Sequence, residues 1–286
     1  MSTQVARTIA AVREAHDSTR TWGGVVGLVP TMGYLHAGHA SLVAAARAEC
    51  DHVTASVFVN PLQFGQADDL ATYPRDLERD LGVAEEAGAD LVFAPAVEEM
   101  YPAGRPFTTV SVAELTAGWE GAVRPGHFDG VATVVAKLFA IAGPSRAYFG
   151  EKDYQQLQVV RRMAVDLDLP VDVVACPTVR EGDGLALSSR NVHLGPEERR
   201  AATVLRRALD AGIAAAAAGE RDPAAVDAAM ARLVTGEPLA QLDYAAIVRP
   251  DTLESPDRIE PGEYRLLIAA RVGKPRLIDN AGVLVG

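Results

Sequence analysis

The fold is decided by residues 29–39, VPTMGYLHAGH, which follow an apolar run and lead into a helical pattern. The run Val25–Val29 predicts a strand, and apolar residues at three- and four-residue spacing predict a helix over Gly38–Glu49. A strand, a tight turn and a helix N-terminus in this order place a ligand at the carboxyl end of a parallel strand. Backbone N–H groups and the helix dipole favour phosphate at such a position.

Two histidines stand at this helix start. His36 and His39 are three residues apart, so both imidazoles project from one side of the helix. Each can donate a hydrogen bond to phosphate oxygens and stabilise the charge that develops when an α-phosphate is attacked. A single histidine here is usually a cap or a surface residue. Two histidines with a glycine between them, directly after a strand and a turn, favour the phosphate role.

Short apolar runs alternate with helical patterns over the first two thirds of the chain, which is typical of a parallel sheet covered by helices. The further expected strands are Val53–Val59, Leu91–Ala94, Ala147–Phe149 and Val171–Ala175. The further expected helices are Asp76–Ala87, Val131–Ile141 and Tyr154–Asp168. We therefore predict a Rossmann-like, doubly wound α/β domain over residues 1–178.

The pattern changes after Thr178 to a polar, glycine-rich stretch followed by alanine-rich helical patterns. The helices expected there are Pro196–Ala218 and Pro223–Val234, and the expected strands are Leu242–Val248 and Tyr264–Ala270. This pattern predicts a smaller α+β C-terminal domain over residues 179–286. The total of 286 residues suits two moderate domains.

The composition is that of a folded globular protein with an acidic surface. Lys and Arg number 27 and Asp and Glu number 38, so the net charge is −11. Such a surface repels polyanions, which argues against nucleic acid as the main partner, whereas local basic groups still bind a phosphorylated small molecule. Cys50 and Cys176 lack metal-binding spacing, and we expect them to be buried and reduced. No apolar run approaches the ~18 residues that span a bilayer, so we expect a cytoplasmic protein without a membrane partner.

Two further segments carry groups that suit ATP. In residues 149–156, FGEKDYQQ, Lys152 can reach phosphate and Asp153 can accept ribose hydroxyls, although a capping Asp beside a solvated Lys is an alternative. In residues 181–191, EGDGLALSSRN, two hydroxyls and the Arg190 guanidinium stand side by side. Such a loop can close over a triphosphate, and the alternative is an ordinary polar linker between domains.

Amides and carboxylates follow the second expected strand. In residues 58–65, FVNPLQFG, the side chains of Asn60 and Gln63 can read a hydroxy acid or can equally satisfy a turn. Farther on, Asp76 and Asp80 lie four residues apart on one face of an expected helix. One of these carboxylates can hold Mg²⁺ beside phosphates, although exposed acids on a helix face are the commoner case.

Together these segments resemble the pantothenate synthetase family, which belongs to the HxGH nucleotidyltransferase-like superfamily of Rossmann-type folds. HxGH alone identifies the superfamily, whereas FVNPxQFG, FGEKDYQQL and SSRN narrow the resemblance to this family. The matching segments cover nearly the whole chain in the family's order and spacing. They are Pro30–His39, Phe58–Gly65, Tyr73–Arg75, Arg124–Phe128, Phe149–Gln156 and Leu185–Asn191.

The resemblance implies a two-step reaction with ATP, pantoate and β-alanine as substrates. The pantoate carboxylate attacks the α-phosphate of Mg-ATP, which gives pantoyl adenylate and pyrophosphate. β-Alanine then displaces AMP to give pantothenate. No side chain needs to act as a nucleophile, because the substrates supply both the carboxylate and the amine. Catalysis then rests on alignment and on charge stabilisation.

The resemblance also implies which residues bind each substrate. The residues expected to act on the phosphates, and so to be catalytic, are His36, His39, Lys152, Ser188, Ser189 and Arg190. The other residues expected at ATP are Pro30, Thr31, Met32, Gly38, Gly150 and Asp153, with the backbone of Val179 and Leu187 at adenine. Pantoate is expected to lie against Gln63, Gln156 and an apolar wall of Pro30, Met32, Phe64, Val134 and Val135.

The resemblance carries further expectations about metal, loop and assembly. Asp80 is expected near Mg²⁺, which phosphate oxygens and water also hold. Leu187 stands where the family usually has Met before Ser-Ser-Arg, and a swap of similar volume should change little. The family suggests a homodimer formed through the N-terminal domain. From the position and charge of the Ser188–Arg190 segment itself, just past the expected domain boundary, we expect the C-terminal domain to act as a lid that closes over ATP.

Two other interpretations compete with this one. Another adenylyl or cytidylyl transferase of the superfamily would use a phosphate ester as acceptor and would want more basic residues in the second pocket than Gln63 and Gln156. A nucleotide-binding module without catalysis is disfavoured because His36, His39 and Lys152 are all present. Pantoate-dependent exchange of labelled pyrophosphate into ATP separates the three interpretations.

Overall fold

The computed structural model describes residues 3–65, 70–71 and 73–286, and the chain divides into two compact units. Unit 1 comprises Met1–Glu151 and Gln155–Pro177, and unit 2 comprises Lys152–Tyr154 and Thr178–Gly286. The short segment Lys152–Tyr154 therefore belongs to unit 2, although the chain on both sides of it belongs to unit 1. Within the described ranges, no helix is long and apolar enough to cross a membrane.

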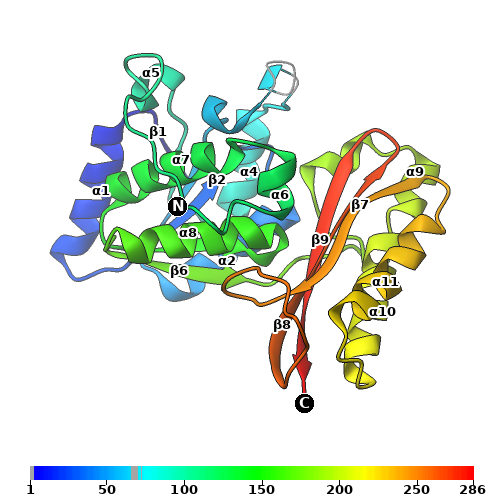
Figure 1. The fold of residues 1–286 in the computed structure, drawn as a ribbon. Helices are drawn as coiled ribbons and strands as arrows, with labels where there is room; N and C mark the ends of the chain where they lie inside the picture. Colours follow the sequence, from blue (N-terminus) through cyan, green and yellow to red (C-terminus); the bar gives the residue numbers. More distant parts are fainter. Residues whose placement is uncertain (1–2, 66–69, 72) are drawn as a thin grey trace. The chain divides into compact units, whose positions relative to one another are not determined.

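Unit 1 is built on a six-stranded parallel sheet in the order β1-β4-β3-β2-β5-β6 (Figure 1). Its strands are β1 Gln4–Ala6, β2 Val26–Thr31, β3 His52–Val57, β4 Leu91–Phe93, β5 Ser145–Gly150 and β6 Val171–Cys176. The strand order reverses between β2 and β5, which pair directly through Leu28 and Ala147. Ligands of open parallel sheets bind at the carboxyl ends of the strands beside such a reversal. The predicted α/β fold is confirmed.

Helices cover both faces of this sheet. They are α1 Ile9–Thr21, α2 Ala37–Glu49, α4 Leu77–Ala87, α5 Val97–Met100, α6 Trp119–Val123, α7 His127–Ala142 and α8 Tyr154–Asp166, with 3₁₀ turns η1 Pro61–Gln63 and η2 Glu151–Asp153. Helices α2 and α4 contact each other on one face, and α1 contacts α7 on the other (Figure 1). The core under α2 includes the buried side chains of Val29, Val43 and Val53. Packing of α2 on β2 fixes where the turn between them lies.

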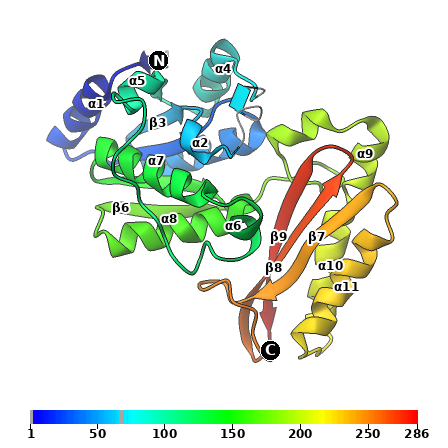
Figure 2. The same cartoon turned by 45° about the horizontal axis from the view of Figure 1, so that its top comes forward.

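Unit 2 contains a three-stranded antiparallel sheet in the order β7-β8-β9. Its elements are η3 Ser189–His193, α9 Pro196–Ala201, α10 Val204–Ala217, α11 Pro223–Thr235, β7 Ala240–Val248, β8 Gly262–Val272 and β9 Arg276–Val285. Helices α10 and α11 pack against one face of the sheet (Figure 2). Their core joins Leu209 and Met230 to Ile247 and Leu266, all of which are buried.

The structure differs from the sequence-based prediction in several elements. Strand β1 was not expected, because it has three residues and is too short for a periodic signal. Helix α1 was not expected either. The single helix expected over Pro196–Ala218 is two helices, since Thr203 N–H bonds to Arg200 O three residues back and the backbone tightens there. β9 was also not expected, because two adjacent polar residues, Asp279 and Asn280, interrupt its apolar pattern.

Both cysteines behave as expected. Cys50 and Cys176 are free thiols and both are buried. Burial raises the pKa of each thiol, which keeps it protonated and unreactive. Neither thiol is therefore a candidate nucleophile.

Candidate functional site

A tight turn carries the chain from β2 into α2. Gly33 has φ +83° and Tyr34 has φ +51°, so two successive residues are left-handed, which costs a non-glycine residue about 1–2 kcal/mol. The buried Asp80 carboxylate accepts the backbone N–H of Tyr34 at 2.8 Å and that of Leu35 at 2.6 Å. A Cβ at position 33 would lie 2.9 Å from Asp80 Oδ2, so the turn favours glycine there. Asp80 thus holds a strained turn in place.

The two candidate histidines lie at the N-terminus of α2, where they also cap the helix. His36 Nδ1 accepts the N–H of Gly38 at 3.1 Å, and His39 Nδ1 accepts the N–H of His36 at 3.3 Å. The ring centroids are 4.1 Å apart. A ring nitrogen that accepts an N–H bond carries no proton, so the neutral imidazoles carry theirs on Nε2. The cap role and the phosphate role are compatible, because the Nε2–H group is the donor that the predicted phosphate contact requires.

The predicted magnesium contact at Asp80 gains no support from this arrangement. Asp80 is 1% exposed, and both of its carboxylate oxygens accept backbone N–H groups. Asp76, the other acid on this helix, caps α4 by accepting the N–H of Arg79. Across residues 3–65, 70–71 and 73–286, no three His, Cys, Asp or Glu side chains gather into a group that could hold a metal ion. Mg²⁺ that arrives with ATP is bound by phosphate oxygens, water and one or two carboxylates, so a Mg²⁺ contact at Asp80 stays a prediction.

The carboxyl end of β3 leads into η1, where Asn60 and Gln63 have different surroundings. Asn60 is 1% exposed, and its Nδ2 donates to Gly130 O at 3.0 Å and to Gln63 Oε1 at 3.1 Å. Its Oδ1 accepts the Tyr101 hydroxyl at 2.9 Å, and burial raises the pKa of Tyr101, so this hydroxyl stays a donor. Of the two roles left open for Asn60, these contacts favour the turn. Gln63 Nε2 donates to Met32 Sδ at 2.9 Å, which joins two of the predicted pantoate residues.

Helix α7 packs closely on the Gln63 segment. Gly130 allows this approach, because a Cβ there would lie 2.3 Å from Leu62 O. His127, at the start of α7, lies with Nδ1 2.8 Å from Gln63 O and donates to it. Farther along α7, Val134 and Val135 are 6% and 4% exposed, so these predicted wall residues belong mostly to the core of unit 1. Phe64 is less buried, and its ring meets Tyr73 edge to face at 5.8 Å.

Two adjacent glutamines in the first turn of α8, Gln155 and Gln156, differ in burial. Gln155 is 5% exposed, and its Nε2 donates to Leu115 O at 2.8 Å and to Gly118 O at 3.0 Å. Its Oε1 accepts the N–H of Glu120 at 2.9 Å, so this side chain holds the segment before α6. Gln156 is less buried, and it is the residue predicted to contact pantoate. The contact of Gln156 with pantoate stays a prediction.

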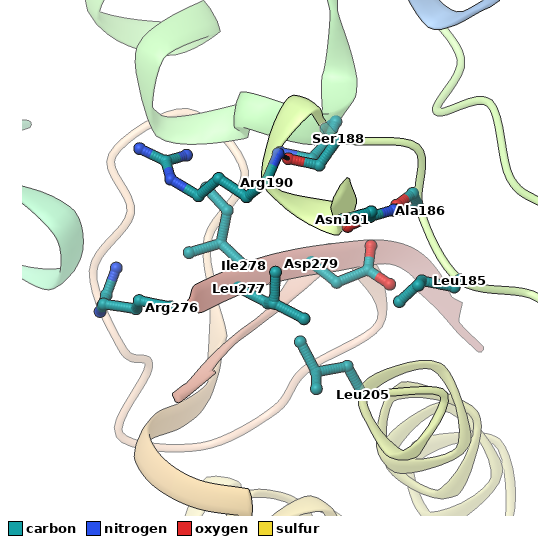
Figure 3. Close-up of a pocket in the computed structure, with 11 residues that line it drawn as sticks. Leu185, Ala186, Ser188, Arg190, Asn191, Leu205, Arg276, Leu277, Ile278 and Asp279 are labelled. Atoms are coloured by element: carbon teal, nitrogen blue, oxygen red, sulfur yellow. Dashed lines mark hydrogen bonds between the residues drawn. The ribbon is translucent and has the colours of Figure 1, made fainter. Parts of the chain in front are cut away.

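One pocket of unit 2 brings together residues from the loop 181–191, α10 and β9 (Figure 3). Lys152 of η2 also lines it. It is lined by Lys152, Leu185, Ala186, Ser188, Arg190, Asn191, Leu205, Arg276, Leu277, Ile278 and Asp279. Three of the predicted phosphate contacts, Lys152, Ser188 and Arg190, therefore share a pocket. Ser189 and Asp153 are not among its lining residues, and Asp153 Oδ1 lies 3.3 Å from Lys152 Nζ.

Hydrogen bonds within the loop set the position of Ser188. Arg180 and Ala186 form a β-bridge, and the Leu187 N–H donates to Val179 O at 3.0 Å. The predicted backbone contact with adenine therefore cannot use the Leu187 N–H. Ser188 follows directly and caps η3 by accepting the N–H of Arg190 at 3.3 Å.

Arg276 is a pocket residue that was not expected from the sequence. Its side chain is 15% exposed, and its Nε lies 2.5 Å from Asp243 Oδ2. It begins β9, and an arginine at the start of an unrecognised strand carries no signal of its own. Together with Lys152 and Arg190 it gives the pocket three cationic side chains, of which Lys152 and Arg276 lie beside carboxylates, and the one carboxylate that lines the pocket, Asp279, is paired with Arg180. The pocket therefore suits an anionic ligand.

The family model for pantoate-beta-alanine ligase matches residues 4–282. The chain belongs to the pantoate-beta-alanine ligase family. It is 56% identical over 276 residues to a pantothenate synthetase of Roseiflexus sp. strain RS-1, covering 96% of this chain and 98% of the relative. A pantothenate synthetase crystal structure from Thermus thermophilus is 55% identical, with a TM-score of 0.90, and covers 98% of this chain and 99% of that chain.

A second crystal structure extends the comparison to a liganded member of the pantoate-beta-alanine ligase family. The pantoate-beta-alanine ligase of Francisella tularensis is 32% identical with a TM-score of 0.79, and the match covers 98% of this chain and 97% of that chain. It was crystallised in complex with beta-gamma ATP and β-alanine. The matched residues span both units, so the likeness to the pantoate-beta-alanine ligase family is not confined to the parallel sheet.

Proposed function

We propose that this chain catalyses the ATP-dependent condensation of pantoate with β-alanine to pantothenate. The observation that carries the proposal is membership of the pantoate-beta-alanine ligase family over residues 4–282. A family member 32% identical to this chain binds β-alanine and beta-gamma ATP, which supports two of the three substrates. The cationic pocket of unit 2 supplies chemistry that suits ATP, and the Gln63 amide, which Asn60 orients, supplies chemistry that suits a hydroxy acid.

The reaction proceeds in two displacement steps. A pantoate carboxylate oxygen attacks the α-phosphorus of ATP, and the bond to the β-phosphate oxygen breaks to release pyrophosphate. The product is pantoyl adenylate, a mixed anhydride. The β-alanine amine then attacks the acyl carbon, AMP leaves, and the amine loses a proton. Because the substrates supply both nucleophiles, the protein contributes alignment, which can be worth roughly 7–11 kcal/mol, and charge stabilisation.

In unit 1 the strained turn presents donors and the η1 segment presents an amide. His36 and His39 donate from Nε2–H to phosphate oxygens, and their Nδ1 atoms hold the helix start that orients the rings. Pro30 and Thr31, at the end of β2, and Gly38, at the start of α2, also lie along ATP. Gln63, whose amide is oriented by Asn60 and Met32, and Gln156 bind the pantoate carboxylate and hydroxyls. Apolar atoms of Met32, Phe64, Val134 and Val135 receive its methyl groups.

In unit 2 the cationic pocket holds the triphosphate. Lys152 and Arg190 contribute charge, and the hydroxyls of Ser188 and Ser189 donate to phosphate oxygens. Gly150 of unit 1 and Asp153 of unit 2 lie against the ribose, and the backbone around Val179 lies against adenine. We further infer that residues 179–286 act as a lid domain that closes when Arg190 meets the triphosphate, that ATP arrives with Mg²⁺ held mainly by its own oxygens, and that the enzyme works as a homodimer.

The decisive experiment is the exchange of labelled pyrophosphate into ATP. The proposed first step is reversible, so exchange should require pantoate and should not require β-alanine. Exchange without pantoate, or no exchange with all components present, would exclude an acyl-adenylate mechanism. Formation of pantothenate on addition of β-alanine, followed by mass spectrometry, then tests the second step.

A further inference from the structure

Two neighbouring residues of β9, Asp279 and Asn280, are buried and reach two other segments of unit 2. Their exposed fractions are 4% and 3%. Successive residues of a strand point to opposite faces of the sheet. Asp279 lies on the face that carries the core side chains Leu277 and Val283, and Asn280 lies on the other face. Burying a polar side chain is unfavourable unless it forms hydrogen bonds. The hydrogen-bond partners of Asp279 and Asn280 therefore indicate which segments β9 holds in place.

Asn280 is bonded to the backbone of Lys152. Its Nδ2 donates to Lys152 O at 2.8 Å, and its Oδ1 accepts Arg265 Nε at 2.8 Å. Arginine only donates, so the atom that faces Arg265 is the amide oxygen, and the amide nitrogen therefore faces the Lys152 carbonyl. The Arg265 guanidinium also lies 4.1 Å over the ring of Tyr154. The segment that carries Lys152 is thus fastened to β8 and β9.

Asp279 holds the base of the loop that carries Ser188 and Arg190. Its carboxylate accepts both guanidinium nitrogens of Arg180, at 2.6 Å and 2.9 Å. Arg180 Nη1 also donates to Gly184 O at 3.0 Å, across the turn of that loop. A bidentate pair of this kind fixes direction as well as distance. The loop base is therefore fastened to the same strand, one residue away from the attachment of Lys152.

We propose that Asn280 is a positioning residue for Lys152 in the adenylation step, with Asp279 as its counterpart for the 181–191 loop. This inference rests on the proposed function. Adjacent attachment points on one stiff strand keep the Lys152 ammonium and the Ser188–Arg190 donors at a fixed spacing before ATP arrives. Alignment errors of about 1 Å can lower a rate by roughly 100-fold, so the attachment matters for the rate.

The test uses Asn280→Asp, which keeps the size of the side chain and the acceptor for Arg265 but replaces the donor at the Lys152 carbonyl. Single-turnover adenylation should fall about 10- to 100-fold, and the pantoate KM should stay near wild type because the Gln63 segment is untouched. Leu284→Ala, at a position on the same strand that is 74% exposed, is the matched control and should leave the rate unchanged. If Asn280→Asp does not fold, Asn280→Ser replaces it.

A double-mutant cycle separates positioning from a general structural role. If Asn280 acts through Lys152, the Asn280 substitution should change the rate by less than about twofold in a Lys152→Ala background. The dissociation constant of a non-hydrolysable ATP analogue, measured in the same four proteins, should show the same coupling. An equal fold loss in both backgrounds would overturn the proposal.

The outcomes also separate this inference from the proposed function. A wild-type protein without pantoate-dependent pyrophosphate exchange would remove the function, and analogue binding would then still report whether Asn280 and Lys152 are coupled. An active wild type in which Asn280→Asp has the wild-type rate would remove only the positioning role.

Discussion

Unit 1 and unit 2 each hold a candidate ligand-binding segment with a buried aspartate, but they do so by different means. In unit 1, Asp80 accepts two backbone N–H groups of the strained turn at Tyr34 and Leu35. In unit 2, Asp279 accepts the guanidinium of Arg180 at the base of an ordinary loop. A left-handed turn is unfavourable by itself, so it is stabilised by hydrogen bonds to its own backbone N–H groups. A loop without such strain is held by a contact to one of its side chains.

Removing each carboxylate should reveal this difference. Asp80→Ala should lower the free energy of unfolding by roughly 2–6 kcal/mol, because two buried N–H groups lose their acceptor at about 1–3 kcal/mol each. Asp279→Ala should cost less, because it removes the acceptor of one backbone N–H, that of Asn280, and of an Arg180 side chain that is 19% exposed. Urea denaturation followed by circular dichroism measures both losses. A larger loss for Asp279→Ala would contradict the comparison.

The same position distinguishes the turn role of Asp80 from the predicted metal role. Asp80→Asn should speed hydrogen exchange at the amides of Tyr34 and Leu35 in the protein without ligands. The Mg²⁺ concentration that gives half-maximal adenylation should stay at the wild-type value. A severalfold rise in that concentration with unchanged amide exchange would support the metal role instead.

The next largest effect is expected at the histidines of the turn. His36→Asn should lower single-turnover adenylation by roughly 10²- to 10³-fold, as for loss of one oxyanion-type donor. Asparagine is itself a good N-cap, so the free energy of unfolding should change little, whereas His36→Ala should also lose about 1 kcal/mol of helix capping. An unchanged adenylation rate in His36→Asn would leave this histidine with the cap role alone.

Alanine substitution at one glycine in each region compares the backbones directly. Gly33→Ala should cost about 1–2 kcal/mol for its left-handed φ of +83°, and more because the new Cβ meets Asp80 Oδ2. Gly182→Ala is the matched control in the 181–191 loop, where a Cβ would meet no atom within 4 Å, and its stability should be near wild type. Melting temperatures of the two variants test this, and equal shifts would count against a strained turn.

The smallest expected effects distinguish the residue predicted to bind pantoate in unit 1 from the residue predicted to bind ATP in unit 2. Gln63→Ala should raise the pantoate KM about tenfold and leave ATP analogue binding near wild type, because a neutral amide oriented by Asn60 is lost from unit 1. Arg190→Ala should do the reverse, because it removes a cation from the unit 2 pocket. Steady-state kinetics and calorimetry provide both quantities. Equal weakening for both substrates in either variant would indicate a disturbed fold rather than a specific contact.

The sequence by itself determined the parallel α/β sheet and the turn with His36 and His39. Both have local signals: apolar periodicity repeats within one element, and the glycine and the two histidines lie within seven residues of one another. The family resemblance added Ser188 and Arg190 as phosphate contacts beside Lys152, but it did not predict that the three residues line one pocket.

Only the tertiary structure decided what Asp80, Asp279 and Asn280 do. Asp80 binds backbone amides 45 and 46 positions away, and any residue could supply those amides, so no side chain in the turn indicates the contact. Asn280 binds a backbone carbonyl 128 positions away, and with Asp279 it breaks the apolar pattern that would have revealed β9. A buried polar residue is stable only through its partner. When that partner is a distant backbone group, nothing near the residue in the sequence records it.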